Sequence, residues 1–335
     1  MSSSRDTRWL DVALKAVLLL VVVAVGYLAY TVLTGQSRDK ETATASTTIG
    51  DLIASIKEDP NDLGLRLQLA EAYGAVGQFD ESVEQFEVVL QLDEDNPDAL
   101  TGLGLIAMFE GEWESAEGYW RSVIDEIGGG QYAGVDQRLA VAYHQLGATL
   151  IERERYREAT KYLDEALRIR PHASDTHYAL AVAHRQLGEA GRQRTHLKDA
   201  LMFDPVMPEA NYDYGLLLLA DGDVAGAAEH FRTSADNAPE GHDEPKDELA
   251  GLGPFEDRLA AATRLAKHDP VGALVEARVA RALDPGSLEA AKLVARLYQR
   301  TGDTTAAREA WQRVLVAWPG ETEAERALEQ LEPQD

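Results

Sequence analysis

A recurring glycine constrains this chain more than any other sequence feature. Gly77 and Gly111 are 34 residues apart, as are Gly188 and Gly222, and Gly302 falls in the same column once two interruptions are allowed. A fixed period of this length indicates structural units that stack on their neighbours, so the fold grows by adding units and not by enlarging one core. We expect seven units, at residues 63–96, 97–130, 140–173, 174–207, 208–241, 254–287 and 288–321.

Two further columns of small residues run through these units. Small side chains let two helix axes approach closely, and large neighbours such as Leu69 and Trp120 then lock them in place. The eighth position holds Ala70, Gly104, Gly147, Ala181, Gly215, Ala261 and Ala295. The twentieth position holds Ser82, Ala116, Ala159, Gln193, Ala227, Ala273 and Ala307. This pattern predicts two antiparallel helices in each unit.

Five units end with a proline in one column, where the helix cannot continue. These prolines are Pro171, Pro205, Pro239, Pro285 and Pro319. With the 34-residue period and the small columns, residues 63–321 closely resemble the tetratricopeptide repeat (TPR) family. The resemblance implies an all-α fold, a right-handed α-solenoid of about seven TPR helical hairpins. It also implies a concave groove that is lined by the first helix of each hairpin and binds other proteins.

The sixth and fourth units depart from this pattern. His268 replaces the turn glycine of unit six and Pro270 follows it, while unit four has Gln193 where a small residue is usual. We retain both as repeats because their other columns hold. The expected organisation is units one to five in 51–241, a linker in 242–253, and units six and seven with a C-terminal cap in 254–335.

The N-terminal part predicts a transmembrane helix. No charged residue occurs from 16 to 37, and about 20 apolar residues of helix cross a hydrocarbon core. We place this helix at 10–34, between a short tail (1–9) and a flexible tether (35–50). A cleaved signal peptide is one alternative, but it needs a shorter apolar run and a small-x-small site. A buried core helix is the other, and the basic residues on both sides of the run disfavour it.

Basic residues flank the predicted span unequally. Those before it are Arg5, Arg8 and Lys15, and those after it are Arg38 and Lys40. Because basic residues prefer the cytoplasmic side, this small excess favours a single-pass protein of the cell membrane with a cytoplasmic N-terminus and an extracytoplasmic TPR array.

Charge and cysteine content exclude several classes of function. The net charge of −26 argues against nucleic-acid binding, which requires clustered Lys and Arg. Residues 51–130 carry 19 Asp and Glu against Lys57, Arg66 and Arg121, which indicates either a solvated surface or a docking face for a basic partner. The chain has no cysteine, so disulfides and thiolate chemistry are excluded.

No catalytic motif is present. His177 and His184 are seven residues apart on an expected helix but lack a His-Glu-x-x-His pattern, and we interpret His184 as a buried histidine with its polar atoms satisfied. The glycines at 128–130 indicate a break between units, since no strand precedes them as in a phosphate loop. We therefore expect no enzyme, no metal site and no cofactor.

The family resemblance implies which side chains line the groove. The candidate partner-binding residues are Leu105, Met108, Phe109, His144, Ile151, Tyr178, Val182, Arg185, Tyr212, Leu216 and Leu219. Most are apolar or aromatic and would be costly to leave in water, with His144 and Arg185 as polar contacts. The alternative is that the chain covers them itself, with the 242–253 segment or the next unit. The Lys and Asn residues with which chaperone-binding members clamp a carboxylate are missing.

The leading interpretation is a membrane-anchored scaffold that binds a protein or peptide and supports the assembly or tethering of a membrane-associated complex. The layout also resembles the TPR subunits of cytochrome c maturation, which present apo-protein to the haem-attaching machinery. A self-associating envelope protein is another alternative, a homo-oligomer in which acidic units one and two meet the arginines of unit three. An enzyme would need a polar cluster in the insertions at 131–139 or 242–253.

Overall fold

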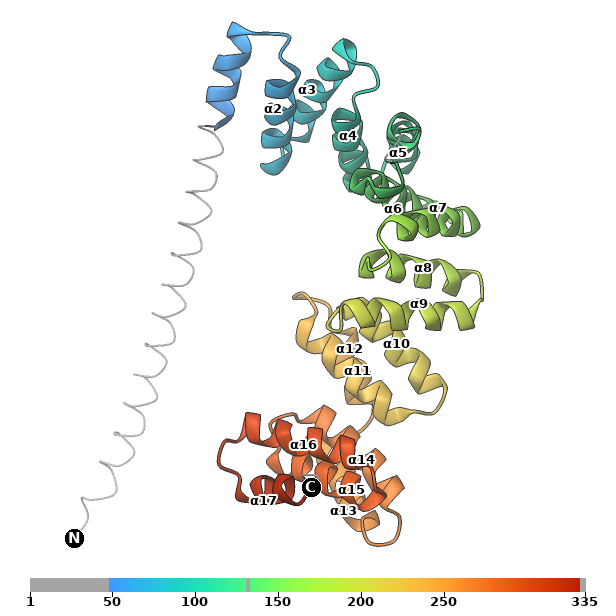
Figure 1. Ribbon diagram of the computed structural model, residues 1–335, viewed down its shortest axis with the longest axis vertical. Coiled ribbons are helices and arrows are strands. Elements are labelled where there is room, and N and C mark those ends of the chain that lie inside the picture. Colours follow the sequence, from blue (N-terminus) through green and yellow to red (C-terminus); the bar gives the residue numbers. More distant parts are fainter. Residues whose placement is uncertain (1–47, 131–132, 332–335) are drawn as a thin grey trace, which may run out of the picture. The chain divides into compact units, whose positions relative to one another are not determined.

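The computed structural model describes residues 48–130 and 133–331, which form two compact bodies (Figure 1). The first body ends at Ala133 and the second begins at Gly134. Every regular element in the described ranges is helical. The prediction of an all-α fold is confirmed for this part of the chain.

In the first body, residues 48–58 are helical and two helical hairpins follow. The hairpins are α2 (Leu63–Ala75) with α3 (Phe79–Leu92), and α4 (Pro97–Glu110) with α5 (Trp113–Gly128). Local sequence sets these bounds: the Asn96 side chain accepts a hydrogen bond from the backbone N–H of Ala99, and Gly111 ends α4 with a φ of 76°.

A 3-10 turn η1 (Ala133–Val135) spans the boundary in sequence, and the second body contains five more hairpins. They are α6 (Gln137–Glu152) with α7 (Tyr156–Ile169), α8 (Ser174–Gln186) with α9 (Ala190–Phe203), α10 (Pro208–Ala220) with α11 (Val224–Asn237), α13 (Phe255–Leu265) with α14 (Pro270–Leu283), and α15 (Leu288–Thr301) with α16 (Thr304–Ala317). The extra helices are α12 (Glu244–Gly251) and α17 (Thr322–Leu331), which packs on α16. The expected seven hairpins are therefore present.

The small residues at position eight let the two helices of a hairpin pack closely together. A Cβ atom added at Gly104 would lie 2.9 Å from two ring atoms of Trp120, and one at Gly147 would lie 2.5 Å from Cγ of Leu163. Trp120 and Leu163 are fully buried. In these two hairpins the large residue at position 24 thus occupies the space that a side chain at position eight would need.

In six of the seven hairpins, all but the sixth, the turn between the two helices uses the left-handed region of φ. Position 15 is a glycine in hairpins one, two, four, five and seven, with φ between 72° and 83°. In hairpin three the same position is Glu154, with a φ of 58°. A non-glycine residue pays a steric cost in this conformation, so Glu154 is a strained substitute for the usual glycine.

The predicted alignment of the sixth hairpin is wrong by one residue. Ala262 is completely buried where Ala261 was expected, and Ala261 is only half-buried. From Ala262 to Ala273 the separation is 11 residues, against 12 between the small columns of the other hairpins. The turn of this hairpin, residues 266–269, has no residue with a positive φ, and Asp269 caps α14 by accepting from the N–H of Gly272.

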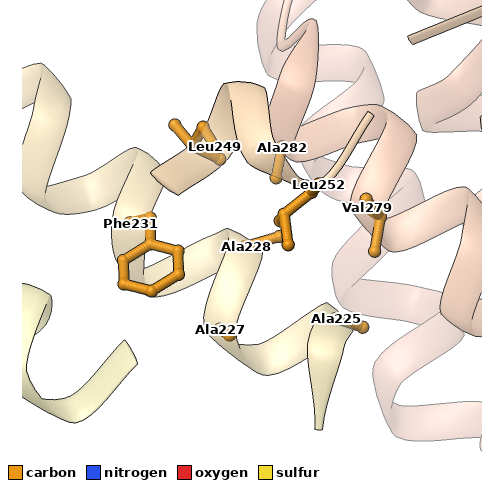
Figure 2. Packing of buried hydrophobic residues seen from close by; sticks show 8 residues of the cluster. All are labelled: Ala225, Ala227, Ala228, Phe231, Leu249, Leu252, Val279 and Ala282. Atoms are coloured by element: carbon orange, nitrogen blue, oxygen red, sulfur yellow. The ribbon is translucent and has the colours of Figure 1, made fainter. Parts of the chain in front are cut away.

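The predicted linker at 242–253 is largely a helix. Elsewhere in the second body the second helix of one hairpin packs on the first helix of the next, as α7 does on α8, but α11 packs on α14. Helix α12 packs where α11 meets α14. Figure 2 shows Leu249 of α12, and Leu252 just after it, in one buried cluster with Phe231 of α11 and Val279 of α14. An insertion between repeats has therefore changed how the sixth hairpin docks.

Two arginine contacts secure this junction. Arg232 of α11 donates from Nε to the carbonyl of Ala282 (2.6 Å) and from Nη2 to that of Leu283 (2.9 Å), so a cation satisfies the last carbonyls of α14. Arg278 of α14 pairs with Glu229 of α11 at 2.9 Å. Polar and apolar contacts thus act together.

Within the described ranges, none of the helices combines the length and the apolar character that a membrane crossing requires. The transmembrane helix predicted at 10–34 and the tail at 1–9 lie outside the described residues. So does the predicted tether as far as residue 47, whereas residues 48–50 are helical.

Candidate functional site

The predicted groove residues fall in both bodies. Leu105, Met108 and Phe109 lie on α4 in the first body, and the other eight lie on α6, α8 and α10 in the second.

An apolar surface is exposed on the first body. Phe109 is 74% exposed and Leu105 is 47% exposed. The ring of Phe109 lies 4.7 Å from that of Phe79, centroid to centroid, at a tilt of 46°. Met108 is turned inward instead, and its sulfur accepts a hydrogen bond from the Trp120 indole at 3.3 Å. Phe109 and Leu105 can thus contact a partner, whereas the Met108 side chain is held inside the hairpin by Trp120.

A hollow of about 350 Å³ lies beside these two side chains. Its lining comes from α2, α3 and α4 and consists of Ala70, Glu71, Gly74, Phe79, Ser82, Phe86, Gly102, Leu105, Ile106 and Phe109. The lining is mainly apolar, and Glu71 is its single charged residue. We call this site the α2–α4 hollow.

His144 is already engaged within the second body. Its Nδ1 lies 3.0 Å from the Thr176 hydroxyl. Burial lowers the pKa of the His144 imidazole, with Arg170 acting in the same direction and Asp175 opposing it. A neutral, hydrogen-bonded ring on α6 is a weaker polar contact for a partner than the sequence predicts. Ile151 on α6 and Val182 on α8 are half-buried.

Tyr178, Arg185 and Asp213 form a polar cluster between α8 and α10. Arg185 Nη1 lies 2.8 Å and 2.9 Å from the two Asp213 carboxylate oxygens, and the Tyr178 hydroxyl donates to Oδ2 at 3.4 Å. Asp213 is 6% exposed, and burial raises the pKa of its carboxyl although Arg185 opposes the shift. Burial also raises the pKa of Tyr178, with the charge of Asp213 adding to the effect. This contact therefore neutralises much of the Arg185 charge.

Tyr212, Leu216 and Leu219 on α10 are partly covered by the chain itself. All three pack against the buried cluster that contains Leu249 and Leu252 of the α12 region (Figure 2). Their half-buried side chains already have apolar neighbours, so they gain less from a partner than Phe109 does.

A second, smaller hollow of about 220 Å³ lies next to the polar cluster. Its lining residues are Tyr178, Pro208, Glu209, Tyr212, Ser234, Ala238, Pro239, His242, Glu244 and Pro245. The predicted pair Tyr178 and Tyr212 thus shares one site, which the start of the α12 segment also borders.

The repeat columns agree with a comparison against known families. Tetratricopeptide repeat models match residues 67–130, 139–170 and 195–242. The chain is a TPR protein. Its hairpins outside these matches carry the same small columns, with the one-residue offset in the sixth.

A curated relative of this TPR protein is cellulose synthase operon protein C of Pseudomonas fluorescens (strain SBW25). The two are 28% identical over 189 residues, which are 55% of this chain and 14% of the relative. The chain thus spans only a small part of that protein's length.

The solved structures that resemble this chain have TM-scores below 0.5. YrrB, described as a TPR protein with an unusual peptide-binding site, is 16% identical, with 59% of this chain and 97% of YrrB covered and a TM-score of 0.46. MamA is 19% identical, with 55% and 97% covered and a TM-score of 0.44. Pseudomonas aeruginosa pilF is 16% identical, with 80% and 97% covered and a TM-score of 0.47.

The fourth hairpin of the TPR protein also holds a histidine cluster that sequence reasoning missed. His184 is buried as predicted, and its Nδ1 lies 2.9 Å from Glu189 Oε2. His177 on α8 lies beside His196 and Asp199 on α9. The signal was present as His-x-x-Asp at helical spacing, but its partner histidine is 19 residues upstream on another helix.

Proposed function

We propose that this TPR protein is a membrane-anchored scaffold, and not an enzyme, that binds a segment of another protein and thereby supports the assembly or tethering of a membrane-associated complex. In this proposal a right-handed solenoid of seven hairpins follows one transmembrane helix at 10–34. The α2–α4 hollow, with Phe109 74% exposed at its edge, is the observation that carries the binding role.

The physical argument begins with the cost of leaving apolar surface in water. Phe109 and Leu105 expose large side chains next to an apolar hollow, and contiguous apolar surface of this kind marks interaction sites. A partner side chain that enters the hollow would remove both surfaces from water. Because Phe79 supports the Phe109 ring at 4.7 Å, the ring is held in place before binding.

Charge defines the partner further. Residues 51–130 have 19 acidic and 3 basic side chains, an excess of 16 (19 − 3), and Glu71 lines the hollow itself. Complementary charge speeds encounter and rejects partners of the same sign. The proposed partner segment therefore has an apolar anchor residue and basic flanks.

Photo-crosslinking in the host tests this role. A photoreactive residue at position 105 should yield a discrete crosslinked protein, and adding Phe109→Ser should remove the crosslink. Val316 is a matched control because it is apolar, lies on α16 and is 84% exposed, so Val316→Ser should leave the crosslink unchanged. Equal crosslinking with Phe109→Ser and Val316→Ser would refute the assignment of the hollow.

The membrane part of the proposal rests on the charge-free run at 16–37. Since the chain has no cysteine, a single Val316→Cys substitution creates a unique label site. Labelling of intact cells by a membrane-impermeant maleimide is expected for an extracytoplasmic array. Labelling only after lysis would reverse the orientation, and recovery of the full chain in the soluble fraction would remove the anchor.

Contacts within hairpin three give self-association less support. Arg155 pairs with Glu158 at 2.6 Å and Arg168 with Glu165 at 3.0 Å, so these arginines are partly neutralised before any neighbour arrives. Presentation of apo-protein in cytochrome c maturation remains an alternative, and the likeness to a cellulose synthase operon protein adds another system in which to seek the partner.

A further inference from the structure

The fourth and twenty-third positions of the repeat face each other, the fourth on the first helix of a hairpin and the twenty-third on its second helix. Direct contacts join this pair in five hairpins. The pairs, from the first hairpin to the seventh, are Arg66 and Gln85, Leu100 and Tyr119, Tyr143 and Tyr162, His177 and His196, Asn211 and His230, Arg258 and Glu276, and Ala291 and Ala310, where Arg258 includes the one-residue offset of the sixth hairpin. Only the fourth hairpin places two histidines there.

The fifth hairpin shows how this pair closes with ordinary hydrogen bonds. Asn211 donates from Nδ2 to the carbonyl of Pro205 at 3.0 Å, and its Oδ1 accepts from Nδ1 of His230 at 2.8 Å. Donor meets acceptor in both contacts. The arrangement is complete without any further group.

The fourth hairpin repeats the first contact, and its second contact joins two imidazole nitrogens, each of which can also be a metal ligand. His177 Nε2 lies 3.0 Å from the carbonyl of Pro171, and a carbonyl only accepts, so Nε2 carries the proton. In a neutral imidazole Nδ1 then holds a lone pair, and it faces Nδ1 of His196 at 3.3 Å. A ring whose outer nitrogen donates to a backbone carbonyl has the tautomer and orientation of a metal-ligating histidine.

Asp199 supplies a third ligand atom. It lies three residues after His196 on α9, and its Oδ2 is 3.9 Å from His177 Nδ1. The three ligand atoms all lie within 4.8 Å of one another. Two nitrogens bound to a tetrahedral zinc at about 2.0–2.1 Å are themselves about 3.3 Å apart, which matches the separation of the two imidazoles.

The surroundings favour neutral rings and leave an entry path. The His184 ring stacks on His196 with centroids 5.4 Å apart, and Phe203 lies 5.7 Å from His177. The imidazoles of His177, His184 and His196 lie close enough together that protonating more than one of them would place like charges side by side. The Asp199 side chain is 35% exposed, and an ion can therefore enter from its side.

We propose that His177, His196 and Asp199 form a binding site for one divalent transition-metal ion of the Zn²⁺ type. Two imidazoles and one carboxylate suit zinc and its neighbours, whereas Ca²⁺ and Mg²⁺ prefer oxygen ligands alone. Three protein ligands leave one position of the ion for water or for a group from a bound protein. The ion ties α8 to α9 across the hairpin.

The neighbouring hairpin supplies variants that should fold. His177→Asn copies Asn211, and Asp199→Thr copies Thr233, the residue at the same position of the fifth hairpin. The full chain, purified without a polyhistidine tag, is titrated with Zn²⁺ against a chromogenic chelator. We expect one zinc per chain and a loss of affinity of at least about tenfold in either variant. His268→Asn, at an exposed histidine elsewhere, should change nothing.

Transplanting the site provides a gain-of-function test. Asn211→His combined with Thr233→Asp places the same three residue types in the fifth hairpin, and we expect a second bound zinc. Zinc should also raise the melting temperature of the original chain but not that of His177→Asn. Equal zinc affinity in the original chain, His177→Asn and Asp199→Thr would overturn the proposal, as would an unchanged stoichiometry in the transplanted chain.

Discussion

The close approach of helices in hairpin two predicts opposite effects for two glycine-to-alanine substitutions. At Gly104 an added Cβ would lie 2.9 Å from Cε2 and from Cζ2 of Trp120. Trp120 is fully buried, and its indole N–H is bonded to Met108, so the ring has no free space to enter. At Gly118, in α5 of the same hairpin, nothing lies within 4 Å of the added atom.

The two variants together isolate the steric cost. In an open helix position alanine is more favourable than glycine by about 0.5–1 kcal/mol, which is the stabilisation expected for Gly118→Ala. The same gain applies to Gly104→Ala, but overpacking of a buried site costs about 1–3 kcal/mol. Subtracting one result from the other cancels the helix term, so Gly104→Ala should be less stable than Gly118→Ala by about 1–3 kcal/mol.

Hydrogen exchange of peptides from residues 97–128 is the appropriate assay, because stability differs between parts of a repeat protein and a global melting curve would average them. Gly104→Ala should speed exchange in these peptides relative to Gly118→Ala and leave those of the second body unchanged. Equal slowing of exchange by both substitutions would refute the argument that the Trp120 ring requires a glycine opposite it.

The other predictions concern four residues. Glu154→Gly should stabilise hairpin three by roughly 1 kcal/mol, because glycine adopts the positive φ without the steric cost; slower exchange in peptides of α6 and α7 checks this, and faster exchange contradicts it. Burial lowers the pKa of His144 and of His230, so their contribution to stability is fully present above about pH 6.5 and is lost as pH falls through the lowered values. Thermal melts from pH 7.5 to 5 should show this loss, and His144→Gln should reduce it; a melting temperature that does not change with pH contradicts the assignment. Leu249→Ala should cost about 2–5 kcal/mol locally and release α12, which limited proteolysis after residue 241 detects, whereas cleavage like that of the original chain would show that α12 does not depend on this contact.

The sequence predicted the hairpins well because their packing is local. Small residues at positions eight and twenty meet within one hairpin, so a 34-residue period is enough to locate them. The sixth hairpin was misaligned at Ala261 because its two small columns are 11 residues apart instead of 12, and only the burial of Ala262 reveals the change. The helix at 244–251 was read as a linker because its short sequence has no repeat to match, and its stability comes from contacts with α11 and α14.

The candidate site was predictable only in part. The positions that line the groove in the TPR family led to Phe109 and Leu105, which are exposed beside the α2–α4 hollow. They could not show that Asp213 neutralises Arg185 or that Met108 bonds to Trp120, because these partners lie on other helices. His196 and Asp199 were missed for the same reason.

The docking of α11 on α14 has a consequence for how the second body unfolds. A row of repeats held by nearest-neighbour contacts can unzip from either end, one hairpin at a time. Arg232 of α11 bonds to carbonyls 50 and 51 residues away in sequence, on α14. When the sixth hairpin unfolds, α11 of the fifth hairpin therefore loses these bonds and the surface on which it packs. Hairpins five and six, with α12 between them, should therefore behave as one cooperative block inside an otherwise modular row.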